Sequence, residues 1–199
     1  MVAYIFQQLN QRGMAAGIDE TVLRKDSRSW FRSAAVNIKT VNTAKLLTDK
    51  ENLKQTIRTT DIGRMYMFSY NPKHKDTLPY YDIFPLIFPI QFSNDGFLGL
   101  NLHYLPPVLR ARLMDALYSI ANNNKYDNTT KLRVSYQILN GAAKYKYFKP
   151  CLKQYLWNHI NSKFINVEPK NWDSALMLPT ERFQKATKDK VWRDSKGMF

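Results

Sequence analysis

The side chains able to perform nucleophilic or metal chemistry are few in this chain and widely separated. It has one cysteine, Cys151, and histidines at positions 74, 103 and 159. On one helix, Cys151 and His159 would lie about 12 Å apart along the axis, too far for a hydrogen bond. We therefore expect Cys151 to be a plain buried thiol. The scattered histidines predict no structural zinc site.

Carboxylates are the other candidates for chemistry, because a metal-dependent nuclease needs several of them to converge. The middle of the chain offers Asp76, Asp82 and Asp95. Asp95 precedes Gly96 and is explained by a turn. We expect Asp82 to accept hydrogen bonds from backbone amides at the start of a strand and His103 to be structural. A catalytic Asp82 and a general-base His103 stay open as the less favoured alternatives.

Known catalytic motifs do not add to these candidates. The sequence contains no GxSxG, HExxH, phosphate-loop or CxxC motif. We therefore predict a protein that is not an enzyme, with no cofactor, no metal and no small-molecule substrate. The uncharged run from Ile83 to Asn94 is short and interrupted by proline. It predicts no membrane span.

Charge is the strongest compositional signal, and it is unevenly distributed. Thirty Lys and Arg against sixteen Asp and Glu give a net charge of +14. Residues 1–60 contribute +5, residues 61–105 contribute −1 and residues 106–199 contribute +10. A nearly neutral, aromatic middle is thus flanked by basic segments. This pattern indicates a polyanionic partner, either nucleic acid or an acidic protein surface.

Basic residues interleaved with aromatic residues are the best candidates for binding that partner. They occur in "KYKYFKPCLK" at 144–153, "LRAR" at 109–112 and "NPKHK" at 71–75. Lysines and arginines bind phosphates without reading sequence, and tyrosines can stack on bases or simply pack. A lysine-rich strand face turned to solvent explains the same pattern about equally well. The predicted nucleic-acid-binding residues are Lys144, Lys146, Lys149, Lys153, Arg110, Arg112, Lys73 and Lys75.

The central segment must position these residues, and its pattern predicts a sheet. "GRMYMFSY" from Gly63 alternates as a strand does, and "FPLIFPIQF" and "FLGLNLHYL" flank a hairpin turn at Asp95-Gly96. Pro85 and Pro89 cannot donate ladder hydrogen bonds, so their segment belongs at a sheet edge or a bend. We expect a small, bent antiparallel sheet over residues 63–105 and 144–148, closed as an SH3-like or similar barrel.

Helical periodicity returns on both sides of this sheet. It predicts a basic amphipathic helix at 19–39, a weaker one at 43–57, and helices within 107–140 and 150–194. The fold class is therefore α+β, with flanking and inserted helices. We predict two parts: a helical N-terminal arm at 1–60 and a compact α+β domain at 61–199.

The sequence of residues 63–117 also resembles that of a known family. "GRMYMFSYNPK", "LPYYDIFPL" and "GLNLHYLP", followed by an arginine-bearing helix, are similar to small virion structural proteins of T4-type tailed bacteriophages. That group includes DNA end protectors and components of the head–tail junction or baseplate.

The resemblance implies a non-enzymatic virion protein, present in the host cytoplasm during assembly. Its implied partners are other virion proteins, at the head–tail connector, tail or baseplate, and the end of the packaged double-stranded DNA. A tail, neck or baseplate adaptor without DNA contact is the alternative, and a metal-dependent nuclease is a distant one. The neutral middle carries the motif but little charge, so the motif is expected to specify the fold rather than the DNA contact.

Overall fold

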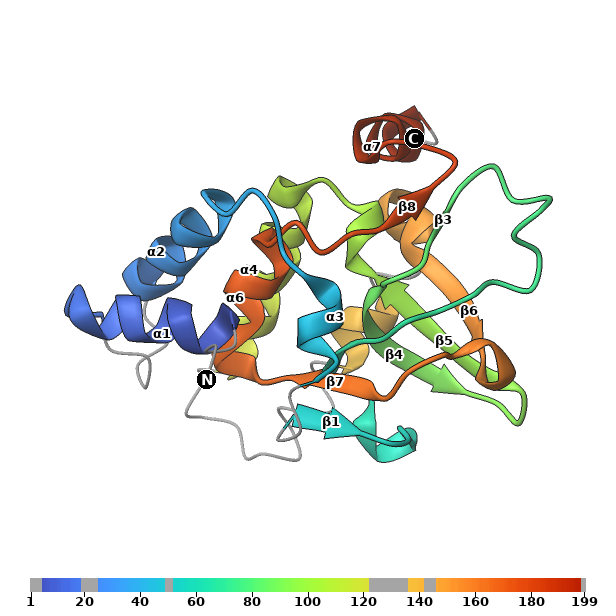
Figure 1. The fold of residues 1–199 in the computed structure, drawn as a ribbon, viewed down its shortest axis with the longest axis horizontal. Coiled ribbons are helices and arrows are strands. Elements are labelled where there is room, and N and C mark those ends of the chain that lie inside the picture. Colours follow the sequence, from blue (N-terminus) through green and yellow to red (C-terminus); the bar gives the residue numbers. More distant parts are fainter. Residues whose placement is uncertain (1–4, 19–24, 49–51, 122–135, 142–145, 198–199) are drawn as a thin grey trace.

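A six-stranded antiparallel sheet organises the structure (Figure 1). This computed structural model describes residues 5–18, 25–48, 52–121, 136–141 and 146–197. The strand order is β1-β7-β2-β4-β5-β6. The strands are β1 (Leu53–Lys54), β2 (Met65–Met67), β4 (Leu86–Phe92), β5 (Gly96–Asn101), β6 (Leu152–Leu156) and β7 (Phe164–Val167). A separate two-stranded ladder joins β3 (Tyr81–Asp82) to β8 (Phe183–Gln184).

Helices α1, α2, α4 and α6 gather on one side of this sheet in Figure 1, where α6 contacts both α2 and α4, whereas α7 lies apart from them. The α-helices are α1 (Ile5–Ala15), α2 (Lys25–Val36), α3 (Thr43–Leu46), α4 (Pro107–Ala121), α6 (Trp172–Met177) and α7 (Lys188–Gly197), with a further helical turn at 136–141. Short 3-10 helices lie between these elements: η2 (Thr59–Asp61), η3 (Leu102–Tyr104), η4 (Lys146–Cys151), η5 (Trp157–His159) and η6 (Pro169–Asn171).

The sheet separates two apolar cores, and the alternation of β2 shows why. Met65 and Met67 enter the larger core, whereas Tyr66 enters the smaller, aromatic one. Successive strand residues point to opposite faces, so a strand that is apolar at every position is buried on both. The strand predicted from Gly63 is thereby confirmed.

The N-terminal helices belong to the larger core. Phe6 of α1 and Phe31 of α2 are buried in the same cluster as Leu86 and Leu176. Ion pairs reinforce this packing, because Arg32 of α2 contacts Asp173 (2.5 Å) and Asp115 (2.8 Å). The predicted division into 1–60 and 61–199 stays a prediction, although these helices pack as part of the main body.

The sheet is open, so the expected SH3-like barrel is not formed by the described residues. Its end strands, β1 and β6, are not paired with each other. Strand β4 is not at an edge, since it pairs with both β2 and β5. Pro85 and Pro89 instead flank Leu86 and Ile87, the two residues that pair with β2. The expected bend is present as a register shift between Pro89 and Gln91.

The segment from 144 to 167 differs most from prediction. The predicted strand at 144–148 is wrong where it is described, because residues 146–151 form η4. The helix predicted from 150 is also wrong, because β6, η5 and β7 occupy residues 152–167. A short apolar run fits both periods, and the pairing partner decides between them. Here the partner is β5, which pairs with β6 from Gly96↔Leu156 to Leu100↔Leu152 and so makes residues 152–156 a strand and not a helix.

Candidate functional site

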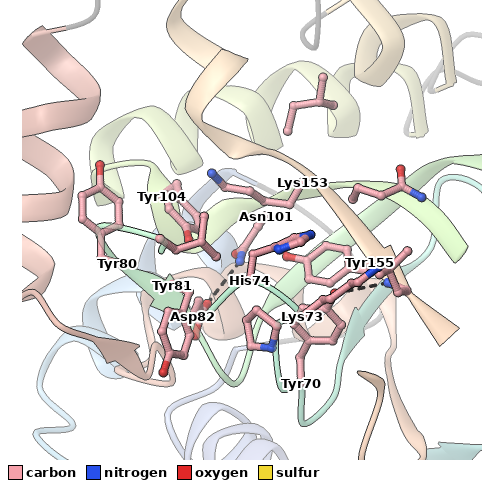
Figure 2. A pocket seen from close by; sticks show the side chains of 15 residues that line it. Tyr70, Lys73, His74, Tyr80, Tyr81, Asp82, Asn101, Tyr104, Lys153 and Tyr155 are labelled. Carbon is pink, nitrogen blue, oxygen red and sulfur yellow. Dashed lines mark hydrogen bonds between the residues drawn. The ribbon is translucent and has the colours of Figure 1, made fainter. Parts of the chain in front are cut away.

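A cleft of about 450 Å³ lies at the β6 edge of the sheet, facing the loop at 71–80 (Figure 2). We call it the tyrosine–lysine cleft. Its lining residues come from the loop, β3, β5, η3 and β6: Tyr70, Pro72, Lys73, His74, Leu78, Tyr80, Tyr81, Asp82, Asn101, Tyr104, Leu152, Lys153, Gln154, Tyr155 and Leu156.

Five tyrosines form most of the aromatic wall. Tyr70, Tyr104 and Tyr155 are buried, and the rings of Tyr70 and Tyr155 pack edge to face with centroids 4.9 Å apart. The Tyr70 hydroxyl accepts a hydrogen bond from the Leu156 amide at 3.2 Å. Tyr80 and Tyr81 are only partly buried. The cleft therefore combines fixed rings with two rings that keep accessible surface.

Lys153 places a cation in this aromatic setting. Its Nζ lies 4.1 Å from the centroid of the Tyr104 ring. Burial lowers the pKa of Lys153. Among the described residues no carboxylate forms an ion pair with it. A partly desolvated ammonium held by a ring face is a site that an anion would stabilise.

Asp82 lies at the base of the cleft, but its carboxylate is fully engaged. Oδ1 accepts the backbone amides of Phe84 (3.0 Å) and Arg182 (3.1 Å). Oδ2 contacts Asn101 Nδ2 (3.2 Å) and His103 Nδ1 (2.6 Å). Burial alone would raise the pKa of Asp82, but His103 and these hydrogen bonds outweigh it and lower the pKa. The expected role in binding backbone amides is confirmed.

Asp82, His103 and Thr180 contact one another in the order carboxylate, imidazole, hydroxyl, which is also the order in a catalytic triad. His103 Nε2 lies 3.1 Å from the Thr180 hydroxyl, on the side opposite Asp82. However, His103 and Thr180 have 0% exposed surface and Asp82 has 4%. A hydrolytic nucleophile must meet its substrate. This row is enclosed and joins η3 to the segments on either side, which agrees with the structural role expected for His103.

The loop at 71–80 is held in place by a residue far along the chain. Lys185 Nζ donates to the backbone carbonyls of Lys75 (2.6 Å), Asp76 (2.9 Å) and Leu78 (3.1 Å). Lys185 has a φ of 66°, a left-handed conformation unusual for a non-glycine residue. Sequence reasoning missed both Lys185 and the cleft, since no local pattern links positions so distant.

Two of the predicted binding residues, Lys73 and Lys153, line this cleft. Lys75, Lys149 and Arg112 are exposed but do not line it. Lys144 lies outside the described residues, and for Lys146 only the backbone, in η4, is described. His74, which also lines the cleft, was part of the "NPKHK" cluster but was not singled out.

Arg110 is a correction to the predicted site. It is 2% exposed, and its guanidinium donates to the carbonyls of Leu105 (2.7 Å), Leu176 (2.8 Å) and His103 (3.2 Å). Burial lowers its pKa to about 10. Its donors hold η3, α4 and α6 together, so the prediction of a phosphate contact is wrong for this residue.

The remaining chemical candidates are structural where they are described. Cys151 is buried, as expected, and burial raises its pKa to about 12. His159 Nδ1 contacts the Asn71 carbonyl at 2.9 Å. Within the described ranges, no three His, Cys, Asp or Glu side chains gather as metal ligands. No helix in that part of the chain has the length and apolarity needed to cross a membrane.

The fold and the cleft define a basic α+β protein with an aromatic, cation-lined cleft at one edge of its sheet. Residues 13–195 match the sequence model of the family described as phage T4 terminal DNA protecting protein, and the chain belongs to this family. The predicted resemblance is thus confirmed, and the match includes the helical flanks as well as the central motif. No curated protein and no solved structure matches the chain.

Proposed function

We propose that this protein binds the end of the packaged double-stranded phage DNA and shields it from nucleases. The family match over residues 13–195 carries this proposal, because the family is described as protecting terminal DNA. Protection of this kind requires occupancy of the end and no chemical step. The protein therefore acts as a binding protein and not as an enzyme.

The charge of the chain supports binding through phosphates. Its net charge is +14, and Lys73, Lys75, Arg112 and Lys149 are exposed cations. None of these four forms an ion pair with another described residue. Phosphate contacts position a protein on DNA without reading its sequence. Such contacts suit a protein that must hold an end whatever its bases.

We place the protein in the virion, at the head–tail axis, where the DNA end would meet it together with connector or tail proteins. The same exposed cations would also suit acidic neighbours in a neck or baseplate. Binding to DNA separates these roles, because an adaptor without DNA contact needs no affinity for duplex ends.

Exonuclease protection tests the proposal directly. Linear duplex DNA is incubated with the purified protein and then with a processive exonuclease, and the surviving length is measured. We expect protection at 50 mM salt that weakens at 200 mM. Affinity should fall by about 10³-fold or more over this interval if six or more phosphates are neutralised. Unprotected ends at both salt concentrations would contradict the proposed function.

Charge reversal at the exposed candidates tests which surface binds. The variant Lys73→Glu, Lys75→Glu, Arg112→Glu and Lys149→Glu should lose protection while keeping the thermal transition, since these side chains are exposed. A matched control reverses Lys39, Lys45, Lys163 and Lys170, which are also exposed but belong to no predicted cluster. Equal loss in both variants would show that total charge, and not this surface, provides the affinity.

A further inference from the structure

The tyrosine–lysine cleft has the dimensions of a small-ligand site and not of a duplex groove. Its volume of about 450 Å³ lies within the ~300–1,000 Å³ typical of such sites. A protein that contacts a duplex from outside does not need a cavity of this kind. The size of the cleft therefore indicates a ligand small enough to enter it.

The cleft offers ring faces beside a cation. Tyr80 and Tyr81 keep part of their surface exposed, and the Tyr80 and Tyr104 rings lie 6.2 Å apart at 36°. Lys153 Nζ lies over the Tyr104 ring, and Lys73 enters from the opposite loop (Figure 2). Aromatic faces stack on bases whatever their identity, and lysines bind phosphate as point charges.

Negative charge in the cleft does not cancel this attraction. Among the described residues that line the cleft, the one carboxylate is Asp82. It accepts hydrogen bonds from the Phe84 and Arg182 amides. It also contacts the side chains of Asn101 and His103. Lys153 is left with a ring face as its recorded partner. An incoming phosphate would supply the anion that the described residues do not provide.

The cleft walls are held in place by contacts within the protein. Lys185 fixes the loop through three carbonyls, and the Asn71 amide donates to the His159 carbonyl at 2.9 Å. A preformed cavity binds with less loss of conformational freedom than one that must be assembled.

We infer that this cleft binds the terminal nucleotide of one DNA strand, with its base against the tyrosines and its phosphate at Lys153 and Lys73. This inference rests on the proposed function and deepens it. A nucleotide inside a duplex is stacked on both sides, whereas the last nucleotide of a strand can leave the stack. A single-nucleotide cleft would thus distinguish an end from continuous duplex, which phosphate contacts alone do not.

An added peptide strand is the other occupant that an open strand edge can recruit. On β6, however, the Leu156 amide already donates to the Tyr70 hydroxyl. A peptide backbone also brings no anion to Lys153. These two features favour the nucleotide.

Calorimetric titration with deoxyadenosine monophosphate tests the cleft on the full chain, and deoxyadenosine provides the phosphate-free comparison. Wild type should bind the monophosphate more tightly than the nucleoside. Lys153→Met, which keeps an aliphatic chain on the Tyr104 ring, should weaken the monophosphate by about tenfold and leave the nucleoside unchanged. Lys73→Met, at an exposed position, should also weaken binding of the monophosphate. It replaces Lys153→Met as the test if that variant unfolds.

A second titration compares linear duplex with a duplex of the same sequence whose ends are closed by hairpins. Wild type should prefer the linear form, and Lys153→Met should lose this preference while keeping its affinity for the closed form. Lys163→Met, exposed, outside the cleft and in no predicted binding cluster, is the matched control and should keep the preference.

The outcomes separate the two proposals. If wild type shows no preference for open ends, the proposed function fails. If wild type prefers open ends but neither cleft variant changes this preference and the monophosphate does not bind, the cleft assignment alone is overturned. Binding of an extended peptide at the β6 edge, with no binding of the monophosphate, would also overturn it.

Discussion

Asp82 shows how one buried carboxylate can organise the base of a cleft. Its two oxygens join the start of β4, the end of β5, η3 and the chain before β8. Three of these partners, at Phe84, Asn101 and His103, are buried groups that need a hydrogen-bond partner. Leaving such a group unpaired costs about 1–3 kcal/mol. The base of the cleft is therefore rigid because this carboxylate is satisfied.

Replacing Asp82 by Asn should destabilise the fold, by about 1–3 kcal/mol at neutral pH. The amide can accept at only one of its two ends, so at least one of the four donors loses its acceptor. Chemical denaturation followed by circular dichroism measures the change. Thr180→Val, which removes a hydroxyl from the far side of His103, is the comparison and should cost less than Asp82→Asn.

The destabilisation should depend on pH in one direction. The pKa of Asp82 is lowered in the folded protein from an ordinary value of 3.8. Its charged form therefore adds stability above the unfolded pKa, and this stability is lost as pH falls through the lower folded pKa. The difference between wild type and Asp82→Asn should be full at pH 6 and shrink below about pH 4. A constant difference down to pH 2 would contradict this account.

At the residue scale, the sequence indicated which residues could form specific contacts, but not whether each side chain is buried or exposed. Asp82 stood out because no turn explained it, and its backbone contacts were predictable from its place before a strand. Arg110 was misjudged because a helical arginine with basic neighbours gives no sign that it is enclosed. The carbonyls that bind it come from η3, the following residue Leu105 and α6, and α6 is distant in sequence.

Among the elements, β6 depends on its neighbour β5 at two glycines. A Cβ at Gly96 would lie 1.9 Å from the Tyr155 carbonyl oxygen, and one at Gly99 would lie 3.2 Å from the Tyr155 ring. These strands can approach each other only because the side chains are missing. The prediction of helices within 150–194 failed at residues 152–156 for this reason, since the signal for β6 lies in β5 and not in its own residues.

Gly96→Ala should therefore separate β6 from β5 and disturb the cleft wall. Overpacking of this kind costs about 1–3 kcal/mol, and the clash here is with backbone, which cannot rotate away. Amide hydrogen exchange should show faster exchange in residues 152–156 than in wild type. Gly141→Ala is the control, because its added Cβ would meet no atom of the described residues within 4 Å beyond its chain neighbours and its own helix backbone. It should leave exchange in β6 unchanged.

On the scale of the whole molecule, the sheet lies between two cores of different composition. The larger core includes residues from α1 and α2, and the smaller one is mainly aromatic. The sequence predicted an α+β protein with a central antiparallel sheet, and local periodicity was sufficient for that. The open order of the sheet, where a closed barrel was expected, and the burial of the N-terminal helices were not predictable, because both depend on contacts between distant segments.

A chain limited to residues 61–199 should not unfold cooperatively. It lacks Phe6, Leu9, Phe31 and Ala35, which are buried in the larger core, and it exposes the surface that they cover. Differential scanning calorimetry measures the transition. Met14→Ser with Val36→Ser, both more than half exposed on the same helices, is the control and should retain it. A sharp transition in the short chain would support the predicted independent domain.

The attachment of the loop to Lys185 has a consequence for biosynthesis. Domains begin to fold from the N-terminus while the ribosome is still translating. The segment that fixes residues 75–78 is separated from them by more than a hundred positions. A nascent chain can thus assemble most of its sheet before the tyrosine–lysine cleft acquires its second wall. A polypeptide released early, before Lys185, would carry the lysines but lack the shaped pocket.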